Sequence, residues 1–108
     1  MARYTVVFSA SVEADLNDVA HWYSQQKVKD LTQYFWEQLQ AAIHHMETMP
    51  KSSPFWHQSG IRRMQIPKFP YHLYYDIQES SSTVRILGII HKRRSISFIS
   101  AKLSQAKS

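Results

Sequence analysis

The sequence predicts an α+β domain in which a helical hairpin packs on an antiparallel-rich sheet of four strands. Three observations support this class. A β-branched and aromatic run opens the chain, two apolar stripes at helical spacing follow, and three strand-like segments come after them. The expected order is therefore strand, helix, helix, strand, strand, strand. The chain has only two glycines, and it contains neither a βαβ repeat nor a glycine-rich phosphate loop.

The first half of the chain predicts one strand and two helices. Tyr4–Phe8 is the strand, and Ser9 or Ser11 can cap the helix after it. The apolar stripe of this helix comprises Val12, Leu16, Val19, Ala20 and Tyr23. A second stripe starts near Lys29, stops at Pro50 and comprises Leu31, Phe35, Leu39, Ala42, Met46 and Met49. Because few residues separate the two helices, we expect an antiparallel hairpin.

The second half predicts the rest of the sheet. Residues 51–59 are expected to form a loop, and turns are expected at 67–70 and 79–82. The predicted strands are Ile61–Ile66, Tyr71–Ile77 and Thr83–His91. The last of these is apolar on both faces, which is typical of a central strand. The tail from Ser95 offers an optional short helix with Ile96, Ile99 and Leu103 on one side.

Composition limits the class of protein. The 108 residues, 44% of them hydrophobic, fit a single domain, residues 1–108, with one core. The absence of cysteine excludes disulfides and thiolate chemistry. No apolar run reaches about eighteen residues and no secretory signal opens the chain, so we expect a cytoplasmic protein without a membrane span. His44 and His45 are adjacent and lack metal-ligand spacing, so we expect no metal and no cofactor.

Charge divides the chain into two unlike halves. Residues 1–50 hold three cations against six carboxylates, a net charge of −3, whereas residues 51–108 hold ten cations against two carboxylates, a net charge of +8. Seven of the thirteen Lys and Arg residues lie in Gly60–Arg94, and Lys51 lies just upstream. This uneven distribution favours a binding face for an acidic partner, either nucleic acid or an acidic protein segment.

Several motifs in this order resemble the RelE/ParE superfamily of type II toxin–antitoxin toxins, and the resemblance covers nearly the whole chain. The motifs are Ala14–Leu16 after the first strand, Met49–Pro50, Gly60–Arg62, Phe69–Tyr75 and Val84–Arg94. The resemblance implies a toxin that a cognate antitoxin holds inactive in a hetero-oligomer. In RelE-like members the concave face of the sheet binds and cleaves messenger RNA on the ribosome. ParE-like members are associated with inhibition of DNA gyrase.

Arginines on the expected strands are the first candidate site residues. Arg62 shares strand parity with Met64 and Ile66, so it would stand on an otherwise inward-facing row. It matches the arginine of the family pattern, which implies phosphate or carboxylate binding through its planar fork. A structural salt bridge to Asp76 is the alternative. Arg63 has the opposite parity and is expected to face solvent.

The end of the last strand supplies the other candidates. His91 shares the parity of Arg85 and can act as an acid or base, or simply hydrogen-bond at the strand end. The resemblance favours Arg94 as the next matching position, and for Lys92–Arg94 both electrostatic binding and solubility stay open. If the protein is a nuclease, its catalytic candidates are His91, Arg62 and Arg94. The candidates for binding a target or antitoxin are Arg62, Arg63, Arg85, His91, Lys92, Arg93 and Arg94.

Aromatic residues admit two interpretations. Tyr71 and Tyr75 are expected in the core, while Tyr74 shares the other face with His72. An exposed Tyr–His pair can stack on bases, but it can also be the polar side of a half-buried strand. The tryptophans are interpreted as core or antitoxin-groove residues; they are Trp22, Trp36 and Trp56. An acidic antitoxin segment is expected to fold into an apolar groove beside the basic half and pair with Arg62 and Arg94.

The C-terminal segment decides between the two branches. Metal-independent RNA cleavage needs cations and two proton-transfer groups, and His91 supplies one such group. RelE-like nucleases commonly carry a tyrosine or similar residue after the last strand, whereas this segment has Phe98 and no tyrosine, histidine or carboxylate. We therefore favour a ParE-like toxin that acts by binding, with DNA gyrase as the target the resemblance implies. The alternatives are a RelE-like ribosome-dependent mRNA endoribonuclease and a non-toxic RNA-binding domain.

Overall fold

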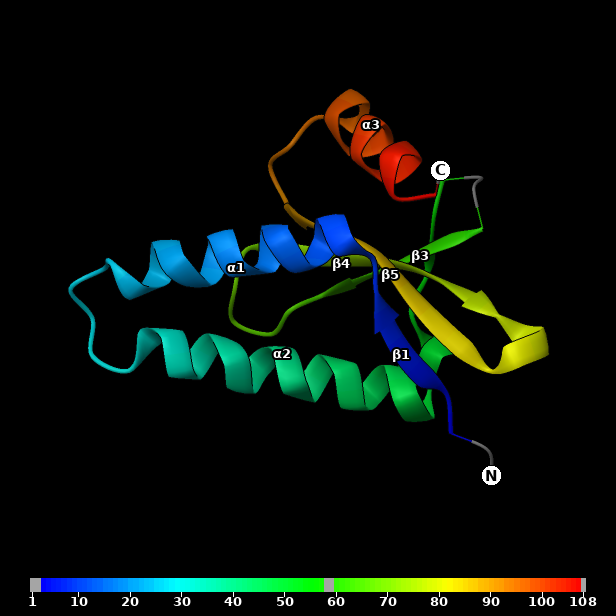
Figure 1. The fold of residues 1–108 in the computed structure, drawn as a ribbon, viewed down its shortest axis with the longest axis horizontal. Coiled ribbons are helices and arrows are strands. Elements are labelled where there is room, and N and C mark those ends of the chain that lie inside the picture. Colours follow the sequence, from blue (N-terminus) through cyan, green and yellow to red (C-terminus); the bar gives the residue numbers. More distant parts are fainter. Residues whose placement is uncertain (1–2, 58–59, 108) are drawn as a thin grey trace.

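The computed structural model describes residues 3–57 and 60–107 and has the predicted α+β class (Figure 1). The helices are α1 (Ala10–Ser24), α2 (Leu31–Thr48) and α3 (Ile96–Lys107). The strands are β1 (Thr5–Phe8), β2 (Phe55–Trp56), β3 (Ile61–Gln65), β4 (Tyr71–Gln78) and β5 (Thr83–His91). Short 3-10 turns at Pro50–Ser52 and Glu79–Ser81 complete the connections.

The sheet has five strands in the described chain, in the order β1-β5-β4-β3-β2, so the prediction of four was wrong by one. The extra strand, β2, lies in the segment expected to be a loop, where Phe55 and Trp56 pair with Arg62 and Ile61. A strand of two residues is too short to be recognised from the alternation of its side chains. β5 lies inside the sheet between β1 and β4, as its two apolar faces predicted. Among the described strands, β1 is the one that pairs in parallel; its partner β5 follows only after the hairpin and three further strands.

The α1–α2 hairpin covers one face of the sheet and extends beyond its end (Figure 1). Ser9 caps α1, since its Oγ accepts a hydrogen bond of 3.3 Å from the Val12 backbone N–H. Apart from the half-buried Val19, the predicted α1 stripe is buried. The α2 stripe is buried at Phe35, Leu39, Ala42 and Met46, whereas Met49, after the helix, is 57% exposed.

The main core lies between this hairpin and the sheet. It joins the buried stripes of both helices to Leu73 and Tyr75 of β4 and to Val84 and Ile86 of β5. Tyr75 also donates a hydrogen bond of 2.7 Å from its hydroxyl to the buried Pro50 carbonyl. The chain that leaves α2 is thereby fastened to the centre of the sheet.

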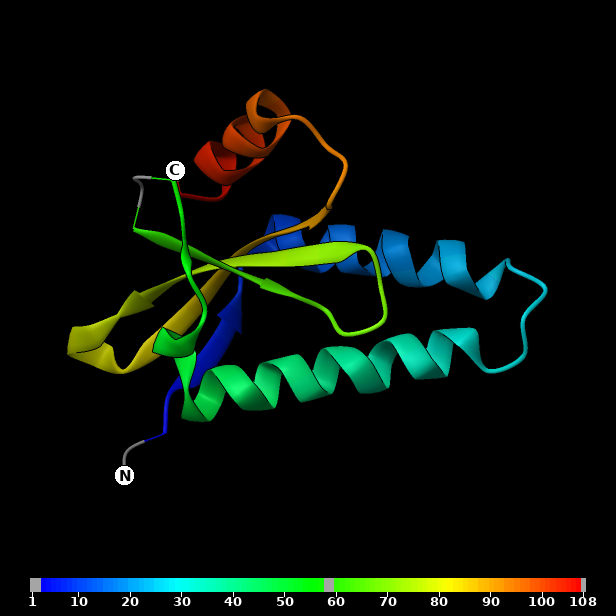
Figure 2. The same ribbon diagram turned by 180° about the vertical axis from the view of Figure 1, so that it is seen from behind.

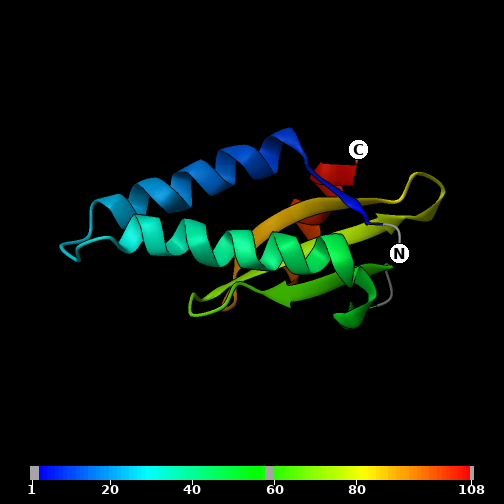
Figure 3. The same ribbon diagram turned by 90° about the horizontal axis from the view of Figure 1, so that it is seen from below.

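The optional C-terminal helix is present as α3, and it packs on the other face of the sheet (Figures 2 and 3). Its buried residues, Ile99 and Leu103, form a second cluster with Ile61, Tyr74, Leu87 and Ile90. Gly88 permits the close approach of α3, because a Cβ there would lie 3.2 Å from Leu103 Cδ2. Ile96 does not share this burial and is 59% exposed, contrary to the prediction.

A β-bulge changes which side chains share a face at the end of β5. Tyr74 pairs with Gly88 and Tyr75 pairs with Ile86, so Leu87 is the additional residue. After Leu87, each side chain of β5 therefore points to the face opposite to the one that simple alternation predicts. His91 pairs with Tyr71 on the hairpin face, with ring centroids 5.3 Å apart, whereas Arg85 pairs with Asp76 on the α3 face. The expectation that His91 and Arg85 share a face was therefore wrong.

Candidate functional site

Three consecutive cations follow β5 in a turn held by backbone hydrogen bonds. The Lys92 N–H donates to the Pro70 carbonyl at 2.9 Å, and the Arg94 N–H donates to the His91 carbonyl at 3.1 Å. The Arg93 N–H donates to His91 Nδ1 at 3.1 Å, which leaves the proton of the neutral ring on Nε2. Within the described chain, the Lys92 and Arg93 side chains have no ion-pair partner. Hydrogen bonds therefore hold the backbone of this basic turn, Lys92–Arg94, while the Lys92 and Arg93 side chains form no ion pair in the described chain.

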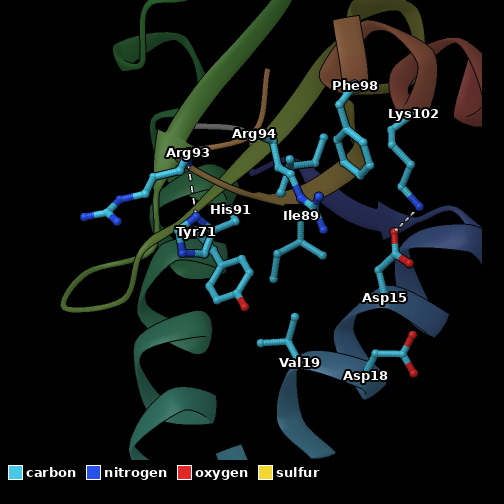
Figure 4. A pocket seen from close by; sticks show the side chains of 11 residues that line it. Asp15, Asp18, Val19, Tyr71, Ile89, His91, Arg93, Arg94, Phe98 and Lys102 are labelled. Atoms are coloured by element: carbon cyan, nitrogen blue, oxygen red, sulfur yellow. Dashed lines mark hydrogen bonds and ion pairs between the residues drawn. The ribbon is translucent and has the colours of Figure 1, made fainter. Parts of the chain in front are cut away.

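On one side of the basic turn, a hollow of about 650 Å³ opens between α1, the end of β5 and α3 (Figure 4). We call it the α1–α3 pocket. Its walls carry opposite charges, because α1 contributes carboxylates and the opposite wall contributes cations. It is lined by Asp15, Asp18, Val19, Tyr71, Ile89, Ile90, His91, Arg93, Arg94, Phe98 and Lys102.

Two contacts order the side chains of the α1–α3 pocket. The Arg94 guanidinium lies over the Phe98 ring at 4.4 Å, a cation–π geometry. Lys102 Nζ lies 2.9 Å from the Asp15 carboxylate, which ties α3 to α1. Phe98 thus stands in the pocket as an apolar support for a cation. It has no proton to transfer to a substrate.

On the other side of the basic turn lies a second hollow, of about 400 Å³, which we call the β2–α3 pocket. Arg94 lines this pocket as well as the first, so the basic turn forms the boundary between them. The pocket combines aromatic and cationic side chains. It is lined by Phe55, Trp56, His57, Arg63, Tyr74, Lys92, Arg94, Ile96 and Ile99.

Two buried polar groups on this face of β4 were not among the predicted site residues. Tyr74 is fully buried, and neither its hydroxyl nor His72 Nδ1 has a hydrogen-bond partner in the described chain. Tyr74 is thus not the exposed stacking residue considered above. Burial raises the pKa of Tyr74, and the nearby Arg63 partly offsets this rise.

His72 is the companion of Tyr74, and the two rings lie 6.2 Å apart at their centroids. Burial lowers the pKa of His72, and the positive charges of Arg63 and Lys92 lower it further. These shifts favour the uncharged forms of both the His72 imidazole and the Tyr74 phenol beside the two cations. The shared strand parity of His72 and Tyr74 was visible in the sequence, but their burial depends on Trp56 and α3, which pack there from distant segments.

Arg62 and Arg85 have their guanidinium groups engaged inside the protein. Arg62 Nη1 donates to the Lys51 and Ser53 carbonyls at 3.1 and 2.7 Å, and the group stacks over Phe55 at 4.0 Å. Arg85 forms a bidentate pair with Asp76 at 3.2 and 2.7 Å. The suggested pair of Arg62 with Asp76 therefore does not form. The side chain of Arg85 is about one-third exposed, so its outer edge remains accessible.

The seven predicted binding residues thus divide by location. Arg63, Lys92 and Arg94 line the β2–α3 pocket, and His91, Arg93 and Arg94 line the α1–α3 pocket. Arg62 lines a separate small hollow with Lys51 and Glu79. The three residues suggested for nuclease chemistry, Arg62, His91 and Arg94, consequently do not line one common pocket.

Two further features are absent from the described residues. No group of three or more histidine, aspartate or glutamate side chains is placed to hold a metal ion there. None of the helices in that part of the chain combines the length and apolar character needed to cross a membrane.

Comparison with known proteins places the chain in a family. The family model for the ParE toxin of the type II toxin–antitoxin system, parDE, matches residues 6–96. The chain therefore belongs to the ParE toxin family, within the RelE/ParE superfamily that its motifs resemble. No curated protein matches the sequence closely enough to serve as a relative.

Solved toxin structures share the fold at low sequence identity. The chromosomal ParDE system of P. aeruginosa aligns with a TM-score of 0.68 and 11% identity, covering 82% of this chain and 95% of that one. A double mutant of E. coli toxin RelE in the free state aligns with a TM-score of 0.67 and 13% identity, covering 97% and 98%. The RelE–RelB complex of Pyrococcus horikoshii aligns with a TM-score of 0.59 and 15% identity, covering 85% of this chain and 98% of that one. These similarities show that the chain shares its fold with solved structures of both ParE and RelE toxins.

Proposed function

We propose that this chain is a ParE-like toxin that acts in the cytoplasm by binding a protein target and is neutralised by a cognate antitoxin. DNA gyrase is the expected target, because the family model that matches the chain is that of ParE. The observation that carries the proposal is the basic turn Lys92–Arg94, whose cations border two pockets on a backbone held by hydrogen bonds. Such a surface suits recognition of an acidic protein partner.

The arrangement of the predicted nuclease residues also supports binding over cleavage. Arg62 is hydrogen-bonded to two backbone carbonyls and lies outside both pockets beside the basic turn. The C-terminal segment contributes Phe98 to the α1–α3 pocket, where it supports Arg94. A general acid and a general base must both lie within hydrogen-bonding reach of the reacting group, and α3 offers His91 no tyrosine, histidine or carboxylate as a companion.

A gyrase supercoiling assay tests the proposal. Purified toxin is expected to reduce supercoiling in a saturable manner. Reversing two charges of the basic turn, Lys92→Glu with Arg93→Glu, is expected to weaken inhibition by about tenfold or more. Lys27→Glu with Lys29→Glu is the matched control, because it changes the same charge in the distant hairpin loop. Undiminished supercoiling at saturating wild-type toxin would contradict gyrase as the target.

RNA cleavage is a second candidate because of one observation. His72 Nδ1 and the Tyr74 hydroxyl are buried without partners next to Arg63 and Lys92, so proton-transfer groups and cations occur together on this face. Translating ribosomes with a defined message provide the assay. Cleavage that Tyr74→Phe and His72→Gln each abolish, in variants with unchanged circular dichroism, would support this function. An uncut message at saturating wild-type toxin would remove it.

A further inference from the structure

We propose that the α1–α3 pocket binds an antitoxin segment that carries both signs of charge and therefore enters in one orientation. An apolar side chain of the segment lies on the pocket floor, a carboxylate faces Arg94, and a lysine or arginine faces Asp18. This inference rests on the proposed function, because it defines the partner of that toxin. It differs from the purely acidic antitoxin segment that the sequence suggested.

The floor of the α1–α3 pocket is apolar apart from the Tyr71 hydroxyl, which points into the pocket (Figure 4). Val19 and Tyr71 are half-buried there, and Ile89, with 4% exposure, lies beside them (Figure 4). A volume of about 650 Å³ exceeds what one side chain fills, so the pocket can hold an apolar anchor together with its neighbours. Burial of that anchor supplies affinity. The charged walls then determine which segments fit.

The basic wall is organised before any partner binds. Arg94 lies over Phe98 at 4.4 Å, and its backbone N–H is hydrogen-bonded to the His91 carbonyl. Figure 4 shows Arg94 pointing into the pocket above Ile89, whereas Arg93 points away from it. A side chain that is already ordered loses less conformational entropy on binding. Arg94 is therefore the cation best placed to receive a carboxylate of the partner.

The acidic wall is the less expected feature, because it occurs beside the most basic part of the chain. Asp15 is compensated by Lys102 at 2.9 Å. Asp18, one turn later on α1, is exposed and has no ion-pair partner within the described residues. Both carboxylates lie on the α1 side of the pocket (Figure 4). An entirely acidic segment would be repelled at Asp18, whereas a segment with a cation at that position would be attracted.

The sign of one substitution tests this proposal. The probe is the purified protein encoded by the reading frame adjacent to the toxin gene, with affinity measured by titration calorimetry at low and high salt. Asp18→Lys is expected to weaken binding about three- to tenfold at low salt and less at high salt. Glu37→Lys makes the same charge change on an exposed part of α2 and serves as the matched control. Arg94→Glu is expected to weaken binding at least as much as Asp18→Lys.

The possible results separate the two proposals. If the wild-type toxin does not bind the adjacent protein, the proposed function fails and this inference fails with it. If it binds but Asp18→Lys tightens the complex, an acidic group of the partner faces this position, and if Asp18→Lys matches Glu37→Lys, no charge of the partner faces it. Either result overturns only this inference. Circular dichroism of each variant confirms that α1 remains folded. Weakening that is specific to Asp18→Lys supports a segment of mixed charge.

Discussion

The two faces of the sheet differ in both size and chemistry. Fourteen buried side chains of the described residues form the cluster beneath the hairpin, whereas six form the cluster beneath α3. The hairpin cluster is apolar apart from tyrosine hydroxyls, and that of Tyr75 is hydrogen-bonded. The α3 face instead buries the unpaired Tyr74 hydroxyl and His72 Nδ1. The difference indicates that the hairpin face stabilises the fold, while the α3 face retains polar groups at some cost in stability.

Adjacent residues of β3 repeat this difference on a smaller scale. Arg62 points to the hairpin face and is held by the Lys51 and Ser53 carbonyls. Arg63 is exposed, pairs across the sheet with Tyr74 and lines the β2–α3 pocket. Strand alternation thus holds one of two identical side chains by backbone carbonyls and leaves the other exposed in a pocket wall.

The largest expected effect comes from the hairpin face. Phe35→Ala removes a fully buried ring that packs against Tyr23 and Phe69, and should lower the free energy of unfolding by about 3–5 kcal/mol. Leu103→Ala is the corresponding truncation of a buried side chain on the α3 face. Hydrogen exchange should show loss of protection throughout the sheet in the first variant and mainly in α3 in the second. If both variants loosen β4 equally, the two faces do not differ in stability as proposed.

A smaller effect distinguishes the two arginines of β3. Arg62→Ala breaks two charge-assisted hydrogen bonds and should cost about 1–3 kcal/mol in urea unfolding. Arg63→Ala should change stability by no more than about 0.5 kcal/mol, because that side chain is exposed. Inhibition of the target should show the opposite order. Arg63→Ala is expected to reduce inhibition although its stability is unchanged. Equal losses of stability would contradict the structural role of Arg62.

The fold was largely predictable from local patterns, because helical stripes and strand alternation are encoded within short segments. Ser9 as a cap, the buried stripe of α2 and the central position of β5 all follow from such patterns. The two-residue strand β2 did not, because its pairing partner lies in β3 and its own length carries no periodicity. Ile96 was misplaced because it immediately follows the Ser95 cap, before the helix reaches the sheet.

The residue types of the candidate site were predictable from the sequence, but the faces on which several of these residues lie were not. The basic turn Lys92–Arg94 was readable as a charge run. The face on which His91 lies was not, because the bulge at Leu87 arises from pairing with β4 and shifts the alternation by one residue. Arg62 and Arg85 looked alike as strand cations, and only the tertiary structure brings carbonyls to one and Asp76 to the other.

The smallest expected effect concerns pH and the polar α3 face. Burial and two nearby cations lower the pKa of His72 in the folded protein below its unfolded value. Between these two pKa values the unfolded chain binds more protons, so this residue contributes stability that is complete above about pH 6.5 and declines as the pH falls. Urea unfolding near pH 7.5 and near pH 5.5 should therefore show a smaller loss of stability for His72→Gln than for wild type.

The matched control for this titration is His21→Gln, at an exposed position of α1. It removes one histidine without altering the α3 face, so it should keep the wild-type fall in stability between the two pH values. If the stability of His72→Gln fell between the two pH values as steeply as that of wild type and His21→Gln, protonation of His72 would not oppose folding. The α3 face would then tolerate a charge at this position, and the contrast with the apolar hairpin face would rest on size alone.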